Sequence, residues 1–221
     1  MRGVRLLPRR YLARAGAAFV AVSGVVGIDA ARAERSAYEV CREATGEVNT
    51  RILACSRILD DLDEPPAVRL RAARERAHAH YLKGDYDQTI ADYTVALQLG
   101  PAEAGLHIDR GLAYEEKNDY ERAIDDYTQA IRIAPDEAKA YHCRGRVHSA
   151  RRDYELAIAD FTEALRTQPG WGFSYYLRAH AYEEIGKTVS AVADYRAALA
   201  ASHRYDETMV KAALRKLGAA P

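Results

Sequence analysis

The sequence lacks the short motifs that usually mark catalysis or cofactor binding. It contains no GxSxG nucleophile elbow, no GxxxxGK phosphate loop, no HExxH metal motif and no CxxC pair. Its lone GxG, Gly170-Trp171-Gly172, indicates a turn. No two of the seven histidines are spaced i, i+4. His180 and Glu184 have that spacing, but no further metal ligand accompanies them in the sequence. We therefore expect no enzyme activity, no cofactor and no metal.

Long hydrophobic runs are also missing, apart from one near the N-terminus. Residues 15–28 are apolar, rich in alanine and glycine, and follow an arginine-rich start. A membrane span needs roughly 20 such residues, so this run is short. With Ala31-Arg32-Ala33 behind it, the run predicts a signal peptide over residues 1–33, cleaved after Ala33. We expect a periplasmic or secreted protein without stable membrane insertion after cleavage, and the alternative is an N-terminal membrane anchor.

Cysteine is scarce, and its three residues divide into a pair and a single residue. Cys41 and Cys55 fall on the two arms of a predicted short hairpin. In an exported protein such a pair is expected to form a disulfide, and the alternative is two buried thiols that pack as small hydrophobic groups. Cys143 is expected to be a partly buried, inert helix residue, and a reactive thiol is its alternative.

Excess positive charge is absent from the body of the chain, although the total net charge is zero. Of 32 basic and 32 acidic residues, six arginines and one aspartate lie in residues 1–33, which leaves 26 basic against 31 acidic residues. Nucleic-acid binding depends mainly on basic contacts to phosphate. We therefore expect no nucleic-acid partner.

What the sequence does contain is a 34-residue period. Repeats of this length indicate stacked supersecondary units, each of which cannot bury its apolar face alone. Four kinds of residue recur at this spacing. They are the prolines Pro101, Pro135 and Pro169; the small residues Ala77, Gly111, Gly145 and Ala179; the aromatic residues Tyr93, Tyr127, Phe161 and Tyr195; and the alanines Ala96, Ala130, Ala164 and Ala198.

The copy at residues 104–137 shows how one unit should fold. Apolar residues at helical spacing predict a helix over residues 104–116, in which Gly111 allows another backbone to come close. Asn118 suits a left-handed turn, and Asp119 is a good N-cap for a second helix that begins at Tyr120. Pro135 follows the end of that helix. The unit is thus predicted to be helix–turn–helix.

This unit resembles the tetratricopeptide repeat. The resemblance rests on Gly111, Tyr114, Ala123, Tyr127, Ala130 and Pro135, and in the next copy on Gly145, Ala157, Phe161, Ala164 and Pro169. It implies an all-α fold, a right-handed solenoid of helix–turn–helix pairs with a C-terminal capping helix, and a function in protein or peptide binding. The outer copies depart from the pattern, with His80 and Thr89 in the first and Ala179 and His203 in the fourth.

The repeat register divides the whole chain. Residues 51–59 echo residues 123–131, with Cys55 in the place of Tyr127. The last helix should pack through Met209, Val210, Ala213, Leu214 and Leu217. The predicted parts are a signal peptide at 1–33; a partial helical hairpin and acidic linker at 34–66; four repeats at 70–103, 104–137, 138–171 and 172–206; and a capping helix and tail at 207–221.

In this family the first helices of the repeats line an inner groove, and the resemblance transfers that role to one face of these helices. Its cationic and aromatic residues favour an acidic partner segment with an apolar anchor. Asp109 and Cys143 stand where a carboxylate clamp would need Asn and a basic residue, so no such clamp is predicted. The groove residues are Arg71, Arg74, His78, Tyr81, Ile108, Leu112, Glu115, Lys139, His142, Arg146, Phe173, Tyr176 and His180.

Three functions are compatible with these features. The favoured one is an exported scaffold or assembly adaptor of the cell envelope that binds a protein or peptide in the groove. The second is a redox or metal-binding protein that uses Cys143 or the histidines. The third is a structural subunit of an envelope complex without a free-standing peptide site.

Overall fold

The computed structural model describes residues 37–43, 47–201 and 207–220. All of these residues belong to one compact unit, Ser36–Pro221. The predicted signal peptide, residues 1–33, lies outside the described residues.

Every regular element in the described part of the chain is an α-helix, which confirms the predicted all-α fold. None of these helices is both long and apolar enough to cross a membrane. The helices are α1 (Ala37–Arg42), α2 (Val48–Asp60), α3 (Pro66–Leu82), α4 (Tyr86–Leu99), α5 (Ala104–Glu116), α6 (Tyr120–Ile133), α7 (Ala138–Ala150), α8 (Tyr154–Thr167), α9 (Gly172–Glu184), α10 (Thr188–Ala201) and α11 (Glu207–Lys216).

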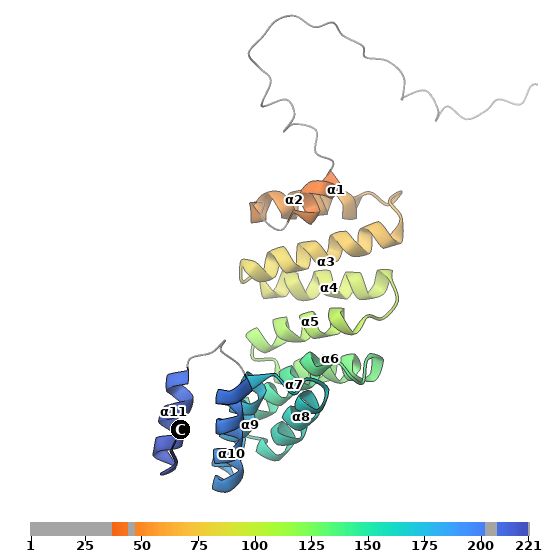
Figure 1. The fold of residues 1–221 in the computed structure, drawn as a ribbon. Helices are drawn as coiled ribbons and strands as arrows, with labels where there is room; N and C mark the ends of the chain where they lie inside the picture. The colour runs from red at the N-terminus through yellow and green to blue at the C-terminus, as the bar shows by residue number, and fades with distance from the viewer. Residues whose placement is uncertain (1–36, 44–46, 202–206, 221) are drawn as a thin grey trace, which may run out of the picture. The chain divides into compact units, whose positions relative to one another are not determined.

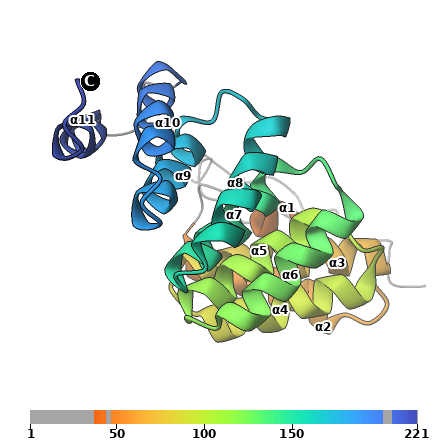
Figure 2. The same ribbon diagram turned by 90° about the horizontal axis from the view of Figure 1, so that it is seen from below.

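The helices from α3 to α10 form four helix–turn–helix pairs, and each pair packs on the next (Figure 1). Within a pair, the second helix returns beside the first, as seen for α3 with α4 and for α9 with α10. Figure 2 shows the same succession from below. As a result, the first helices α3, α5, α7 and α9 follow one another along the solenoid.

A residue in the left-handed backbone region closes the turn of each pair. The φ angle is 77° at Gly84, 59° at Asn118, 66° at Arg152 and 75° at Gly186. Glycine reaches this region freely and asparagine with little strain, whereas another residue pays about 1–2 kcal/mol. Arg152 is thus the one strained turn residue of the four.

Small residues on the first helices let the two helices of a pair approach closely. A Cβ added to Gly111 would lie 2.7 Å from a ring carbon of Tyr127, and one added to Gly145 would lie 2.9 Å from the ring of Phe161. The close approach predicted at Gly111 therefore involves an aromatic ring of the second helix and not a backbone. Tyr127 and Phe161 are fully buried and form the centres of their repeats.

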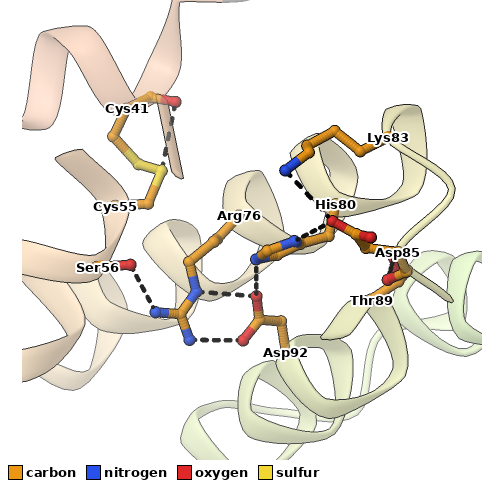
Figure 3. A network of polar contacts seen from close by, with 9 residues as sticks. All are labelled: Cys41, Cys55, Ser56, Arg76, His80, Lys83, Asp85, Thr89 and Asp92. Atoms are coloured by element: carbon orange, nitrogen blue, oxygen red, sulfur yellow. Dashed lines mark hydrogen bonds and ion pairs between the residues drawn. A yellow bond between two sulfur atoms is a disulfide. The ribbon is translucent and has the colours of Figure 1, made fainter. Parts of the chain in front are cut away.

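The N-terminal hairpin of α1 and α2 packs on α3. Cys41 and Cys55 are both buried, with their Cα atoms 4.9 Å apart. This separation lies within the range of disulfides, roughly 4.4–6.8 Å. Figure 3 shows the two residues beside Ser56 of α2. The predicted disulfide stays a prediction that peptide mapping can test.

The last helix, α11, packs on α10 and covers the end of the fourth repeat. Val210 and Leu214 are fully buried with Tyr195. Met209 was expected on the same face but is 58% exposed, because it precedes Val210 by one position and is therefore turned about 100° around the helix.

Candidate binding groove

The groove face is defined here as the side of α3, α5, α7 and α9 that carries the predicted groove residues. Most of these residues reach the surface. Arg71, Arg74, His78, Lys139, Phe173 and His180 are exposed, and Tyr81, Leu112, Glu115, Arg146 and Tyr176 are half-buried. They are available for contact with a partner.

Two of the predicted groove residues are buried and need correction. Ile108 is 2% exposed and packs with Ala123 and Tyr127. His142 is 4% exposed, its Nδ1 lies 2.8 Å from the Ser174 hydroxyl, and its ring stacks on Trp171 at 4.2 Å. Both side chains fill space between helices, so they support the groove from beneath and do not line it.

His142 is held in its neutral form. Burial lowers its pKa to about 4, and the nearby Arg146 guanidinium acts in the same direction. The neutral imidazole therefore links α7 to α9 through Ser174 and Trp171. Sequence analysis did not identify Trp171 as part of the groove, because it lies between helices in a segment that indicates only a turn.

The cations on α7 are neutralised within the protein. The Lys139 ammonium lies 3.2 Å from an Asp109 carboxylate oxygen, and the Arg146 guanidinium pairs with the Glu115 carboxylate. Glu115 also accepts a hydrogen bond of 2.9 Å from the Tyr127 hydroxyl. These two cations were expected to attract an acidic partner, but their charge is balanced by carboxylates of α5.

The cations on α3 are not balanced in this way. Arg71 donates a hydrogen bond of 3.1 Å to the neutral Tyr38 hydroxyl. Arg74 is 44% exposed, and its acidic neighbour, Glu75, lies 3.7 Å away while also pairing with Arg51 at 3.5 Å. The positive character of the groove face is therefore concentrated on the first repeat.

A hollow opens on the groove face beside these arginines. It lies one turn along α3 from Arg74 and is formed by residues of α3, α4 and α5. Burial, together with the Glu116 carboxylate, raises the pKa of Tyr81 to about 12, so its hydroxyl stays a hydrogen-bond donor. The lining residues are His78, Tyr81, Leu82, Tyr93, Asp109 and Leu112.

Aromatic side chains characterise the other end of the groove face. The Phe173 and Tyr176 rings are nearly parallel at 6.1 Å between centroids, and the Tyr176 ring lies 5.8 Å from that of Tyr195. Phe173 is 41% exposed. This end offers an apolar surface anchored in the core of the fourth repeat.

A repeated polar contact that sequence analysis missed fixes the first helices in place. In the first repeat, Arg76 donates two hydrogen bonds, of 2.9 and 2.6 Å, to the Asp92 carboxylate of α4. Its remaining nitrogen donates a bond of 2.9 Å to the Ser56 hydroxyl of α2, as Figure 3 shows. One arginine thus joins its own repeat to the preceding helix.

The same arrangement, called here the arginine bridge, recurs in every repeat. Its signal in the sequence was the 34-residue spacing of an Arg and an Asp sixteen residues later, with a Thr two residues after that Asp in the first three repeats. The further bridges are Arg110 with Asp126 and Thr94, Arg144 with Asp160 and Thr128, and Arg178 with Asp194 and Thr162.

The residues considered for redox or metal chemistry are poorly placed for it. Cys143 is 3% exposed, and burial raises the pKa of its thiol to about 11, so the reactive thiolate is scarce at neutral pH. This favours the inert packing role. His180 lies 3.9 Å from Glu184 on the surface. Within the described residues, no three His, Cys, Asp or Glu side chains are grouped as metal ligands would be.

Comparison with known families identifies the repeat. Family models described as tetratricopeptide repeat match residues 104–137, 138–171 and 174–202. The chain belongs to the tetratricopeptide repeat family. No curated protein matches the sequence.

Solved structures of other tetratricopeptide repeat proteins share the fold. A crystal structure of MamA superposes with a TM-score of 0.67 at 19% identity, covering 81% of this chain and 92% of that chain. YrrB, described as having an unusual peptide-binding site, gives 0.63 at 15% identity, covering 76% and 84%. The first tetratricopeptide repeat of Spaghetti, bound to the HSP90 peptide SRMEEVD, gives 0.50 at 22% identity, covering 52% and 90%.

Proposed function

We propose that this tetratricopeptide repeat protein is a scaffold of the cell envelope that binds a protein or peptide segment on its groove face. The observation that carries the proposal is the groove face itself. It combines exposed arginines on α3, a hollow beside them and exposed aromatic rings on α9. A surface of preformed helices costs little ordering entropy on binding. YrrB, described as having an unusual peptide-binding site, and Spaghetti, bound to an HSP90 peptide, support this class of function.

The partner segment is proposed to be acidic near one end and apolar near the other. Arg71 and Arg74 would receive the acidic end, because the lysine and arginine of α7 are already paired with Asp109 and Glu115. Phe173 and Tyr176 would receive an apolar anchor. Each exposed charge contributes under ~1 kcal/mol, whereas an aromatic anchor contributes ~2 kcal/mol or more.

Binding measurements on matched variants test the groove. The partner is recovered from a periplasmic extract, identified and purified, and its affinity is measured by calorimetry at two salt concentrations. Arg74→Ala is expected to weaken binding and its salt dependence, and Tyr176→Ala is expected to weaken binding more. Arg132→Ala, an exposed change on α6, is the control. If both groove variants bind like the parent protein, the groove is not the site.

The envelope location has an independent test. The arginine-rich start, the apolar run at 15–28 and Ala31-Arg32-Ala33 support export with cleavage after Ala33. N-terminal sequencing of protein from the periplasm or medium is expected to begin at Glu34. Material that keeps Met1 and sediments with membranes would favour the membrane-anchored alternative.

A further inference from the structure

The acidic linker between α2 and α3 presents an apolar side chain to solvent. Residues 60–64 read Asp-Asp-Leu-Asp-Glu, and Leu62 in the middle is 77% exposed. In the described part of the chain, none of the four carboxylates pairs with a basic side chain. A large exposed apolar residue among unpaired charges of one sign is a surface that a complementary site could cover.

The linker is also held in one shape. The Asp61 side chain accepts a hydrogen bond of 3.0 Å from the Asp63 backbone N–H, and the Asp61 carbonyl accepts one of 3.3 Å from the Glu64 N–H. Pro65 and Pro66 then fix the backbone where α3 begins. A segment that is already ordered loses less entropy when it binds.

The complementary site is the α3 end of the groove face. Arg71 and Arg74 supply exposed positive charge, and the hollow that begins one turn further along α3, at His78, supplies an apolar recess with Leu82 and Leu112. Along an α-helix, positions four apart lie on one face about 6 Å apart. If an acidic residue of a docking segment pairs with Arg74, a neighbouring leucine of that segment would therefore lie over the hollow.

We propose that residues 60–64 of one copy of this protein dock on the α3 end of the groove face of a second copy. The carboxylates beside Leu62 face Arg71 and Arg74, and the Leu62 side chain enters the hollow. The proposal rests on the groove being a binding surface, as proposed above. The linker does not fill the hollow of its own chain, because Leu62 is exposed and absent from the hollow's lining.

This contact joins two different surfaces, so it is heterologous. Each copy offers one linker and one groove, and such contacts form chains or closed rings. Self-association should therefore increase with protein concentration and decrease with salt, since charge pairs at the surface are screened.

Sedimentation velocity on the full chain tests the docking. Leu62→Ser removes the apolar anchor, and Arg71→Gln with Arg74→Gln removes the charges that receive the linker. Both variants are expected to associate at least tenfold more weakly than the parent protein. Leu156→Ser, which changes a 54% exposed leucine on α8, is a control expected to associate like the parent. Circular dichroism checks that every variant is folded.

Mixing the two variants gives the decisive result. The linker variant keeps an intact groove and the groove variant keeps an intact linker, so an equimolar mixture should form a one-to-one dimer that does not grow further. A parent protein that stays monomeric at all concentrations and salts, or a mixture that stays monomeric while the parent associates, would overturn the proposal.

A peptide separates this inference from the proposed function. A fluorescent peptide of residues 58–66 is expected to bind the parent protein, and to bind the Arg71→Gln, Arg74→Gln variant at least tenfold more weakly. If an external partner binds the groove and this peptide does not, the groove function holds and the self-docking is wrong. If neither binds, both are wrong.

Discussion

At the scale of single residues, contacts between the two helices of a repeat leave almost no free space. Gly111 and Gly145 face aromatic rings so closely that no side chain fits without movement, and Tyr127 and Phe161 are themselves fully buried. Interiors packed at this density resist added volume because neighbouring atoms cannot relax far. The proposed binding at the groove face depends on these contacts, since they set the position of each first helix.

Gly111→Leu should therefore destabilise the protein. The added side chain would overlap the Tyr127 ring, and overpacking of this kind costs typically about 1–3 kcal/mol. Gly105→Ala is a control on the same helix, because nothing lies within 4 Å of its added Cβ. Replacing this glycine should be neutral or stabilise by about 0.5–1 kcal/mol. Urea unfolding followed by circular dichroism measures both, and equal stability of the two variants would contradict the close contact.

His142 should make stability depend on pH. Its pKa is about 4 in the folded protein and near 6.5 when unfolded, so between these values only the unfolded chain binds the proton. Stability is then fully present above pH 6.5 and decreases as the pH falls toward 4, by about 2 kcal/mol between pH 7 and pH 5. His142→Gln should flatten this part of the pH profile. Urea unfolding at pH 7 and pH 5 compares the variant with the parent protein.

At the scale of helices, each first helix is held by polar contacts as well as by apolar packing. The arginine of each bridge binds the Asp of its own second helix through two nitrogens and a hydroxyl of the preceding helix through the third. A lysine cannot reproduce this planar fork. The bridge thus couples the packing within a repeat to the packing between repeats.

Arg144→Lys should lower the free energy of unfolding by about 1–3 kcal/mol, since hydrogen bonds to charged groups are lost at Asp160 and Thr128. Thr128→Val, which keeps the shape and removes the hydroxyl, should cost about 1 kcal/mol. Combining the two changes should cost less than their sum, because both break the same contact. Additive losses in chemical unfolding would show that the arginine and the threonine act separately.

The hairpin of α1 and α2 is expected to carry a Cys41–Cys55 disulfide, which would close a short loop and contribute ~3 kcal/mol by the chain-entropy model. Reduction, or the Cys41→Ser variant, should lower the thermal midpoint, whereas Cys143→Ala should leave the bond intact. Peptide mapping without reductant checks the pairing, and free thiols at both positions would contradict it.

Several helices could be predicted because the residues that determine them lie close together in the sequence and recur at a regular spacing. The left-handed turn at Asn118 and the helix start at Tyr120 follow from residues a few positions apart. The buried states of Ile108 and His142 could not be predicted in the same way. They depend on Tyr127 in the facing helix and on Trp171 directly before α9, which sequence spacing alone does not place nearby.

At the scale of the whole described unit, the pattern of charge on the groove face could be predicted only in part. The sequence identifies which cations lie on the first helices, but pairing between neighbouring repeats decides which of them remain available. Lys139 and Arg146 meet carboxylates thirty and thirty-one residues earlier, whereas the arginines of α3 have no preceding repeat of this kind. The first repeat therefore differs from the others through its position in the array.

The arginine bridge also makes the repeats interchangeable building blocks. Within residues 104–137, Arg110 donates a hydrogen bond to a threonine of the preceding repeat. Thr128 of the same segment accepts one from an arginine of the following repeat. A second copy of this segment inserted after residue 137 would find matching bridge partners on both sides, so the array could be lengthened by gene duplication with the arginine bridge kept at each border. In the fourth repeat the threonine's place is taken by Arg196, which donates instead to the Ala220 carbonyl. A further copy therefore keeps the arginine bridge when it is inserted between repeats, but not when it is added after the fourth repeat.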